Sequence, residues 1–188
     1  MMKKALVLVA VLTMFAAFSS ISAKGTKTAS ARIESCTDAA IEGTARLREN
    51  RSPEGVKLVS IELVVKGLPR GKHAVHIHEV GTCSPCGAAK GHFDPGPHSN
   101  SNPDGNHPFH MGDLENIESN EEGHARLKVS TTRITLSDGP LSLFDEDGSA
   151  FIIHVDPDTY CPDGVEKGCA GGARAACGII KMDRGSRR

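Results

Sequence analysis

The sequence is poor in aromatic residues and shows no convincing helical periodicity. It has no tryptophan, one tyrosine and six phenylalanines among 188 residues. Neither charge is in large excess, since the formal net charge is −1. It becomes −3 if the N-terminal segment is removed, because Lys3 and Lys4 are lost with no acidic residue. This balance suggests neither a nucleic acid nor an anionic membrane as a partner.

Residues 1–23 have the features of a secretory signal peptide. Lys3 and Lys4 form a charged start, an apolar run extends from Ala5 to Phe18, and small residues follow at Ser22 and Ala23. The apolar run is too short and too close to the start to favour a permanent membrane anchor. Six cysteines in an exported chain predict disulfides. We therefore expect a periplasmic or secreted protein.

Turn-forming residues are abundant and clustered, which indicates many turns between short strands. We expect strands near residues 31–36, 43–48, 56–65, 73–80, 111–117, 123–129, 133–136, 149–155 and 175–182. Two long loops, 81–108 and 156–174, are longer than usual for a compact domain and are therefore expected to be functional. About eight strands without a repeat predict an all-β fold, an eight-stranded Greek-key β-barrel or sandwich of immunoglobulin-like type.

The expected layout has one domain. A flexible leader, residues 24–30, follows the signal. The folded domain spans residues 31–182, and residues 183–188 form a basic tail that we expect to be frayed.

Seven of the nine histidines lie between Gly71 and Asp113: His73, His76, His78, His92, His98, His107 and His110. So many imidazoles in a core would leave polar groups half satisfied, whereas neutral imidazole is a common ligand of copper and zinc. His76 and His78 are two apart on an expected strand, so both face the same side. His73 faces the other side and is expected to have a structural role.

Two further signals complete this pattern. His110 and Asp113 are three apart, and Gly112 allows the chain to fold both inward. A carboxylate beside imidazoles suits zinc better than copper(I). His154 ends an apolar strand, where a solvent-facing histidine would be unexpected, and is interpreted as the last ligand of the site.

The chain resembles the copper,zinc superoxide dismutase family of the exported bacterial type. The matching motifs, in family order over roughly residues 33–181, are HAVHIHEVG, GHFDP, HMGDLENI, FIIHVDPD and ARAACGII. The resemblance implies a Greek-key barrel. It also implies dismutation of superoxide to oxygen and hydrogen peroxide by alternate reduction and oxidation of a histidine-bound copper.

Ligands follow from the same resemblance. Copper is expected to be held by His76, His78, His92 and His154, and zinc by His92, His98, His110 and Asp113. His92 then bridges the two ions, and it is expected to be catalytic. The gap from His92 to His98 is shorter than the family leads us to expect, so His107 is the rival zinc ligand. If neither binds, the site is copper-only.

Two charged residues match supporting positions of the family. Asp158 corresponds to the carboxylate that orients one copper and one zinc histidine, although a plain turn aspartate is the alternative. Arg174 corresponds to the arginine that guides superoxide, because a permanent cation beside copper attracts a small anion.

Cys177 resembles the C-terminal half-cystine of the family. Its partner is expected in the loop before His92, with Cys86 preferred and Cys83 as the alternative. Cys161 and Cys169 could form a second pair, which leaves Cys36 for Cys83. Six cysteines allow 15 pairings, so the sequence alone does not fix the connectivity.

The predicted function is that of a copper- and zinc-dependent superoxide dismutase. The alternative is an exported domain that binds or buffers copper and zinc without turnover. Such a domain needs the histidines but neither Arg174 nor an accessible copper. The sequence leaves monomer and homodimer open.

Overall fold

The computed structural model describes residues 26–96, 107–162 and 167–186. The part of the chain outside these ranges includes the predicted signal peptide and His98. The described residues form ten strands and two short 3₁₀ helices, with no α-helix among them. The strands are β1 (Lys27–Ser35), β2 (Glu42–Arg51), β3 (Lys57–Lys66), β4 (Gly71–His73), β5 (Val75–His78), β6 (Ile117–Ser119), β7 (His124–Thr131), β8 (Ala150–His154), β9 (Arg174–Ile179) and β10 (Lys181–Met182), and the 3₁₀ helices are η1 (Cys86–Ala89) and η2 (Arg184–Ser186).

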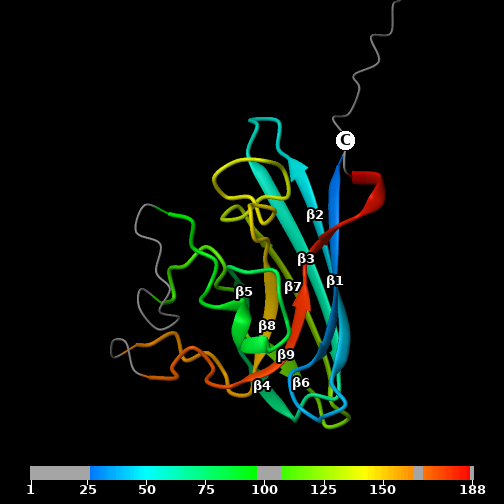
Figure 1. Cartoon of the computed structure of the whole chain (residues 1–188), viewed down its shortest axis with the longest axis vertical. Coiled ribbons are helices and arrows are strands. Elements are labelled where there is room, and N and C mark those ends of the chain that lie inside the picture. The colour runs from blue at the N-terminus through cyan, green and yellow to red at the C-terminus, as the bar shows by residue number, and fades with distance from the viewer. Residues whose placement is uncertain (1–25, 97–106, 163–166, 187–188) are drawn as a thin grey trace, which may run out of the picture.

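All ten strands belong to one antiparallel sheet. The order is β4-β6-β7-β3-β2-β1-β9-β8-β5, and β10 pairs with β1 (Figure 1). The two end strands, β4 and β5, follow each other in the chain and are separated only by Ala74. This short connection brings the two edges of the sheet together, so the sheet forms a nearly closed barrel. The expected all-β Greek-key barrel is confirmed.

The barrel interior follows from alternation along the long strands. The buried residues of β1, β2 and β3 alternate with residues that face outward, from Ala29 to Ile33, at Ala45 and Leu47, and from Val59 to Val65. Leu63, for example, is fully buried, which contributes about 2 kcal/mol relative to an exposed leucine. The short strand β8 is buried on both faces, because one face lies in the barrel and the other lies under the metal-binding loops.

Nine strand segments were expected and ten strands are present, because two of the expected strands are divided and one, 133–136, is not formed. The strand expected at 73–80 divides at Ala74, whose backbone N–H donates to the carbonyl of Asp156 instead of to a strand partner. The strand expected at 175–182 divides at Ile180, whose N–H donates to the carbonyl of Ser149. At Ala74 and Ile180 the backbone bonds to a loop residue, and on the far side of each break the chain returns to the sheet as a new strand.

Two expected strands are largely absent. Of residues 111–117 only Ile117 is in a strand, because Asp113 pairs with His76 in an isolated bridge at the metal-binding end. Residues 133–136 form a turn-like segment with a single bridge from Thr135 to Ser142. The apolar residues Ile134 and Leu136 are still buried there. The apolar pattern of this segment therefore indicated burial correctly but not pairing in a strand.

The boundaries expected at the two ends of the domain require correction. Strand β1 begins at Lys27, inside the segment predicted to be a flexible leader, because β2 and β10 offer backbone partners on both sides. The predicted frayed tail is also docked as far as Ser186. Ser30 Oγ donates to Asp183 Oδ1 at 2.8 Å, and Thr28 N donates to Ser186 Oγ at 2.9 Å.

Three disulfides cross-link the described chain: Cys36–Cys86, Cys83–Cys177 and Cys161–Cys169. The preferred pairing of Cys86 with Cys177 is therefore wrong, and the alternative partner Cys83 takes that place. Cys83 and Cys86 are only three residues apart, so spacing could not separate them. The two cysteines nevertheless bond to different parts of the sheet, Cys83 to Cys177 in β9 and Cys86 to Cys36 directly after β1.

No helix among the described residues is both long and apolar enough to span a bilayer.

Candidate metal centre

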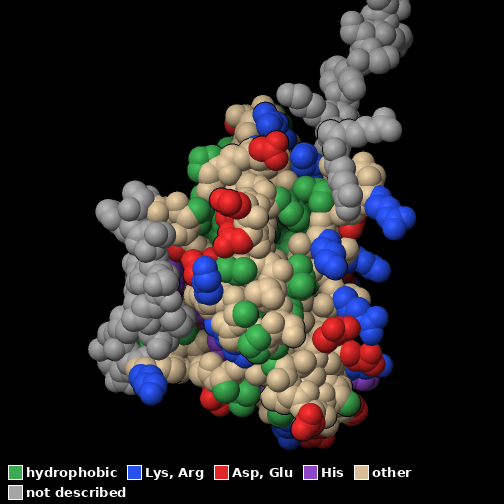
Figure 2. Space-filling model, viewed as in Figure 1, with side chains coloured by type: hydrophobic (Ala, Val, Ile, Leu, Met, Phe, Trp, Pro, Cys, Tyr) green, Lys and Arg blue, Asp and Glu red, His purple; other side chains and the backbone are tan. Residues whose placement is uncertain are grey.

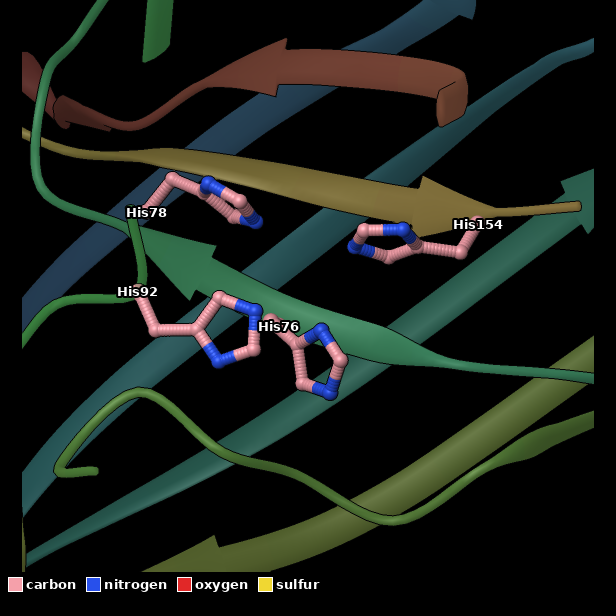
Figure 3. Close-up of side chains that lie close together, drawn as sticks. All are labelled: His76, His78, His92 and His154. Carbon is pink, nitrogen blue, oxygen red and sulfur yellow. The ribbon is translucent and has the colours of Figure 1, made fainter. Parts of the chain in front are cut away.

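Four histidine rings converge at one side of the barrel. His76 and His78 come from β5, His154 ends β8, and His92 lies on the loop that follows η1 (Figure 3). The ring centroids of His76 and His92 are 4.0 Å apart, those of His78 and His92 4.9 Å, and those of His76 and His154 5.0 Å. None of the four side chains is more than 4% exposed. We call these four residues the histidine cluster.

Each ring of the histidine cluster uses one nitrogen to fix its orientation. Nδ1 of His78 lies 2.8 Å from the carbonyl oxygen of Lys90, and Nδ1 of His154 lies 2.9 Å from that of Gly172. His76 uses the other nitrogen, Nε2, which lies 3.0 Å from Asp158 Oδ2.

The remaining nitrogens have no hydrogen-bond partner. They are His76 Nδ1, His78 Nε2, His92 Nε2 and His154 Nε2, and all four are buried. A buried polar atom without a partner costs about 1–3 kcal/mol, so four of them facing one another call for a ligand. The four side chains offer nitrogen atoms within 4.8 Å of one another, which fits one metal ion.

The protonation of these rings suits metal binding. Burial lowers the pKa of His76 to about 3 and that of His154 to about 4, and it lowers the pKa of His78 well below its ordinary value. The pKa of His92 is also lowered, chiefly by burial. All four rings are therefore neutral near pH 7, and a neutral ring nitrogen has the lone pair that a metal needs.

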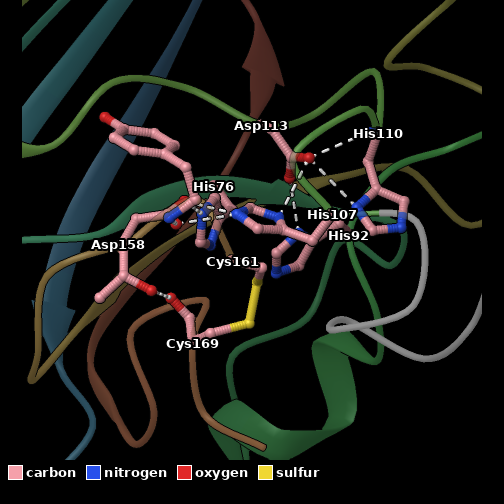
Figure 4. The surroundings of a disulfide bond; sticks show 10 residues. His76, His92, His107, His110, Asp113, Asp158, Cys161 and Cys169 are labelled. Carbon is pink, nitrogen blue, oxygen red and sulfur yellow. Dashed lines mark hydrogen bonds and ion pairs between the residues drawn. A yellow bond between two sulfur atoms is a disulfide. The ribbon is translucent and has the colours of Figure 1, made fainter. Parts of the chain in front are cut away.

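A second group surrounds the carboxylate of Asp113, which is 3% exposed (Figure 4). His92 Nδ1 lies 2.6 Å from Asp113 Oδ1, and the Nδ1 atoms of His107 and His110 each lie 3.2 Å from Asp113 Oδ2. Three imidazoles and one carboxylate form a donor set typical of tetrahedral zinc. We call His92, His107, His110 and Asp113 the aspartate cluster.

The electrostatics of the aspartate cluster favour a cation. Burial opposes ionisation of Asp113, but its hydrogen bonds with His107, His110 and His92 outweigh burial and hold its pKa well below the usual range. Burial also opposes charge on His107, yet the bonds to Asp113 and Asp158 raise its pKa to about 9. A positive charge is thus stabilised at the position where a metal ion would replace the ring protons.

His92 belongs to both clusters. Its Nδ1 faces Asp113, and its Nε2 faces the other rings of the histidine cluster. Asp158 makes a second connection, because its carboxylate lies 3.0 Å from His76 Nε2 and 2.8 Å from His107 Nε2. Asp158 is 3% exposed and therefore orients one ring of each cluster rather than serving only as a turn residue.

Two residues that support this arrangement were not found from the sequence. Asn116 holds the loop of Asp158, since its Oδ1 accepts from Asp158 N at 2.8 Å and its Nδ2 donates to Asp158 O at 2.9 Å. Arg133 donates to the carbonyl oxygens of His110 and Asp113. Asn116 lies in the HMGDLENI motif but was given no role there, and Arg133 lies in none of the motifs, because both residues act through backbone atoms of distant segments.

Arg174 lies at the start of β9, where it is paired with His154 across the sheet. Its guanidinium donates to the carbonyl oxygens of Cys86 and Lys90. The carbonyl of Lys90 also holds His78, so one short segment orients both the cation and a ring of the histidine cluster. Burial lowers the pKa of Arg174, but a guanidinium remains charged near neutral pH.

Two predicted residues lie apart from the clusters. His73 has its ring nitrogens 3.0 Å from the carbonyl oxygen of His154 and 2.8 Å from that of Pro69, which agrees with the structural role expected from its face of the strand. His98 lies outside the described residues, between 97 and 106. Its rival, His107, lies beside Asp113, with Nδ1 3.2 Å from Asp113 Oδ2.

The sequence model for copper/zinc superoxide dismutase (SODC) matches residues 41–180, well over half of the chain. The chain belongs to this family. It is 40% identical over 151 residues to superoxide dismutase [Cu-Zn] 2 of Aquifex aeolicus strain VF5, which covers 77% of this chain and 82% of the relative. It is 38% identical over 155 residues to superoxide dismutase [Cu-Zn] of Deinococcus radiodurans, covering 75% and 78%.

The relative from Caulobacter vibrioides, also a superoxide dismutase [Cu-Zn], is 35% identical over 137 residues, covering 69% of this chain and 74% of its own length. With the family established, the two clusters have a direct meaning. The protein is a copper- and zinc-dependent superoxide dismutase, with a cluster of histidines for copper and a cluster of histidines with Asp113 for zinc, and His92 belongs to both.

Proposed function

We propose that each residue of the two clusters is a metal ligand. Copper would be held by Nδ1 of His76 and by Nε2 of His78, His92 and His154, which are buried atoms without a hydrogen-bond partner. Zinc is held by Nδ1 of His92, His107 and His110 and by the carboxylate of Asp113. His107 replaces His98 in the earlier assignment, and the contact of its Nδ1 with Asp113 supports this choice.

When bound, copper supplies the one-electron chemistry that converts superoxide to oxygen and hydrogen peroxide. The residues of the chain supply geometry, charge and protons. Asp113 fixes the His92 ring on its Nδ1 side, so Nε2 is the nitrogen that would hold copper and, when it is not bound to the ion, would carry a proton to the reduced product. A zinc ion at Nδ1 would keep the ring in the same orientation.

Arg174 provides the positive charge for the substrate. Superoxide is a small anion, and a guanidinium fixed by two carbonyl oxygens beside the copper site attracts it and holds it in place. Because both carbonyls belong to the loop that also orients His78, the cation and the copper ligand keep a constant separation.

We also propose that the protein works outside the cytoplasm, in a periplasm or as a secreted enzyme, after removal of residues 1–23. Three disulfides among the described residues support this location, since such bonds persist in oxidising compartments.

The zinc assignment can be tested with a matched pair of variants, His107→Ala and His98→Ala. Each is purified, loaded with copper and zinc, and analysed for metal content and for zinc affinity by chelator competition. We expect His107→Ala to lose zinc affinity by at least about 10- to 100-fold and His98→Ala to match the wild type. Zinc loss only in His98→Ala would overturn the assignment.

A further inference from the structure

The outer face of β1, β2, β3 and β7 carries three rows of side chains across the four strands. The strand register sets these rows, because residues paired across antiparallel strands point to the same side. The rows are Thr28–Arg48–Ser60–Ser130, Ser30–Arg46–Glu62–Lys128 and Arg32–Thr44–Val64–Arg126. We call these twelve residues the basic face.

The basic face has five cations and one carboxylate, although the whole chain has a formal net charge of −1. Glu62 is its only acidic residue, and it pairs with Arg126 and, at 3.9 Å, with Lys128. Arg32 is paired with Glu34, which lies two residues further along β1, with Nε 2.9 Å from Oε1. The cations of this face are therefore only partly neutralised, and Arg46 and Arg48 are the two that have no ion pair with a described residue.

The same face is hollowed. A groove of about 740 Å³ is lined by Arg46, Arg48 and Lys128. Hydroxyl groups of Thr28, Ser30, Ser60 and Ser130 also line it, together with the carboxylate of Glu62, which is paired with Arg126. Asp183 also borders the groove, but its carboxylate accepts from Ser30 Oγ. Guanidinium, ammonium and hydroxyl groups together donate hydrogen bonds to oxyanions.

The basic face is turned away from the metal centre. In Figure 1 the metal-binding loops lie on the side of β5, and β1 and β2 form the opposite side. In Figure 2, Lys and Arg side chains gather along that opposite side. An occupant of the groove would therefore leave the approach of superoxide to copper open.

The chemistry of the face selects one kind of occupant. The grid of four strands and three rows measures about 14 Å by 14 Å, an area of roughly 200 Å². This area is far below the roughly 800 Å² that each partner buries in a specific protein interface. A membrane-binding face needs apolar or aromatic groups to enter the lipid, and among the twelve residues only Val64 is a large apolar one. A narrow chain of repeated anionic groups fits a narrow cationic groove.

We propose that the basic face binds a linear polyanion whose charges are sulfate or phosphate groups, and that it thereby retains the enzyme beside anionic polymers outside the cytoplasm. The contacts are made by Arg46 and Arg48 from β2 and by Lys128 from β7. The binding depends on neither metal and does not change the dismutation reaction.

The test uses fluorescently labelled dextran sulfate and the full metal-loaded protein. Binding is measured by anisotropy at about 10 mM and about 150 mM salt, where the screening length falls from roughly 30 Å to about 8 Å. The variant Arg46→Glu/Arg48→Glu is compared with Arg70→Glu/Lys72→Glu, which changes the net charge equally at the other end of the strand order. Neutral dextran and vesicles containing anionic lipid are the parallel ligands.

We expect the wild type to bind dextran sulfate but not dextran, with affinity that falls with salt. The change at Arg46 and Arg48 should weaken binding at least about tenfold, and the change at Arg70 and Lys72 should weaken it less than about twofold. Both variants should keep wild-type dismutation, which shows that they are folded. Equal weakening in both variants would overturn the proposal, because net charge alone would then explain the binding. Tighter binding to the vesicles, lost with Arg46 and Arg48, would replace the polymer by a membrane surface.

Discussion

The barrel wall and the metal-binding end of this protein are stabilised in different ways. In the wall, apolar residues are buried and charged residues face solvent, as alternation requires. At the metal-binding end, polar side chains are the buried ones, including His76, His78 and His92, which are 0% exposed. Burying polar rings is unfavourable unless each finds a partner. The wall is therefore expected to fold without metal, whereas the other end needs its ions and disulfides.

The largest expected effect is that of His92→Ala. The variant removes the one ring shared by both clusters, so it should abolish dismutation and weaken both copper and zinc binding. The barrel core should remain intact, because His92 lies on a loop. Metal content, superoxide consumption and circular dichroism measure these three properties. Near-normal turnover in a fully metallated variant would contradict the shared role of His92.

Arg174→Glu should have the next largest effect. It should leave copper content unchanged but reduce kcat/KM by about 10- to 1000-fold, because reversal of the charge repels superoxide. The wild-type rate should fall as salt rises, and that of the variant should rise. Lys72→Glu is the matched control, with the same charge change on β4. An unchanged rate at low ionic strength would refute guidance by Arg174.

A substitution in the wall should show the opposite pattern. Leu63→Ala leaves a cavity in the barrel and should lower the free energy of unfolding by about 2–5 kcal/mol. Metal content and dismutation should remain at wild-type levels below the unfolding temperature, because β3 pairs with β2 and β7 and not with β5 or β8, which carry His76, His78 and His154. Denaturant unfolding of the metal-loaded protein measures the first effect, and metal analysis the second. Loss of copper from the folded variant would contradict the contrast, because it would show that metal binding depends on packing in the barrel wall.

The smallest expected effect comes from Cys36→Ala/Cys86→Ala. This disulfide ties the segment that holds Arg174 and His78 to the end of β1. Its removal should loosen that segment and lower kcat/KM about two- to tenfold, with faster backbone hydrogen exchange at Gly87–Gly91. The control is Cys161→Ala/Cys169→Ala, which removes a disulfide from the other loop. Equal exchange at these amides in both variants would show that the Cys36–Cys86 bond does not position Arg174.

The same contrast explains what could be predicted from the sequence. Alternation in 56–65 predicted strand β3, although the burial expected on both faces is found on one face only. The HxH spacing placed His76 and His78 on one face, because facing is a local property of a strand. The zinc side could not be resolved in this way. His98 and His107 both lie in a loop rich in glycine and proline, and backbone reach permits either to approach Asp113.

Residues that act through backbone carbonyls were missed for a similar reason. Arg133 was expected only as part of a strand, yet it donates to the carbonyls of His110 and Asp113. A carbonyl oxygen is present at every residue, so no residue type marks the position that receives such a bond. The choice between Cys83 and Cys86 failed because three residues of a turn decide which strand each cysteine meets.

The shared position of His92 is tested most directly by electron paramagnetic resonance of the protein with copper(II) in the histidine cluster and cobalt(II) in the aspartate cluster. One imidazole that joins two paramagnetic ions couples their spins, so the copper signal of the doubly loaded protein should be broadened or lost and should return when zinc replaces cobalt. An unperturbed copper signal in a sample with both sites filled would contradict the bridge.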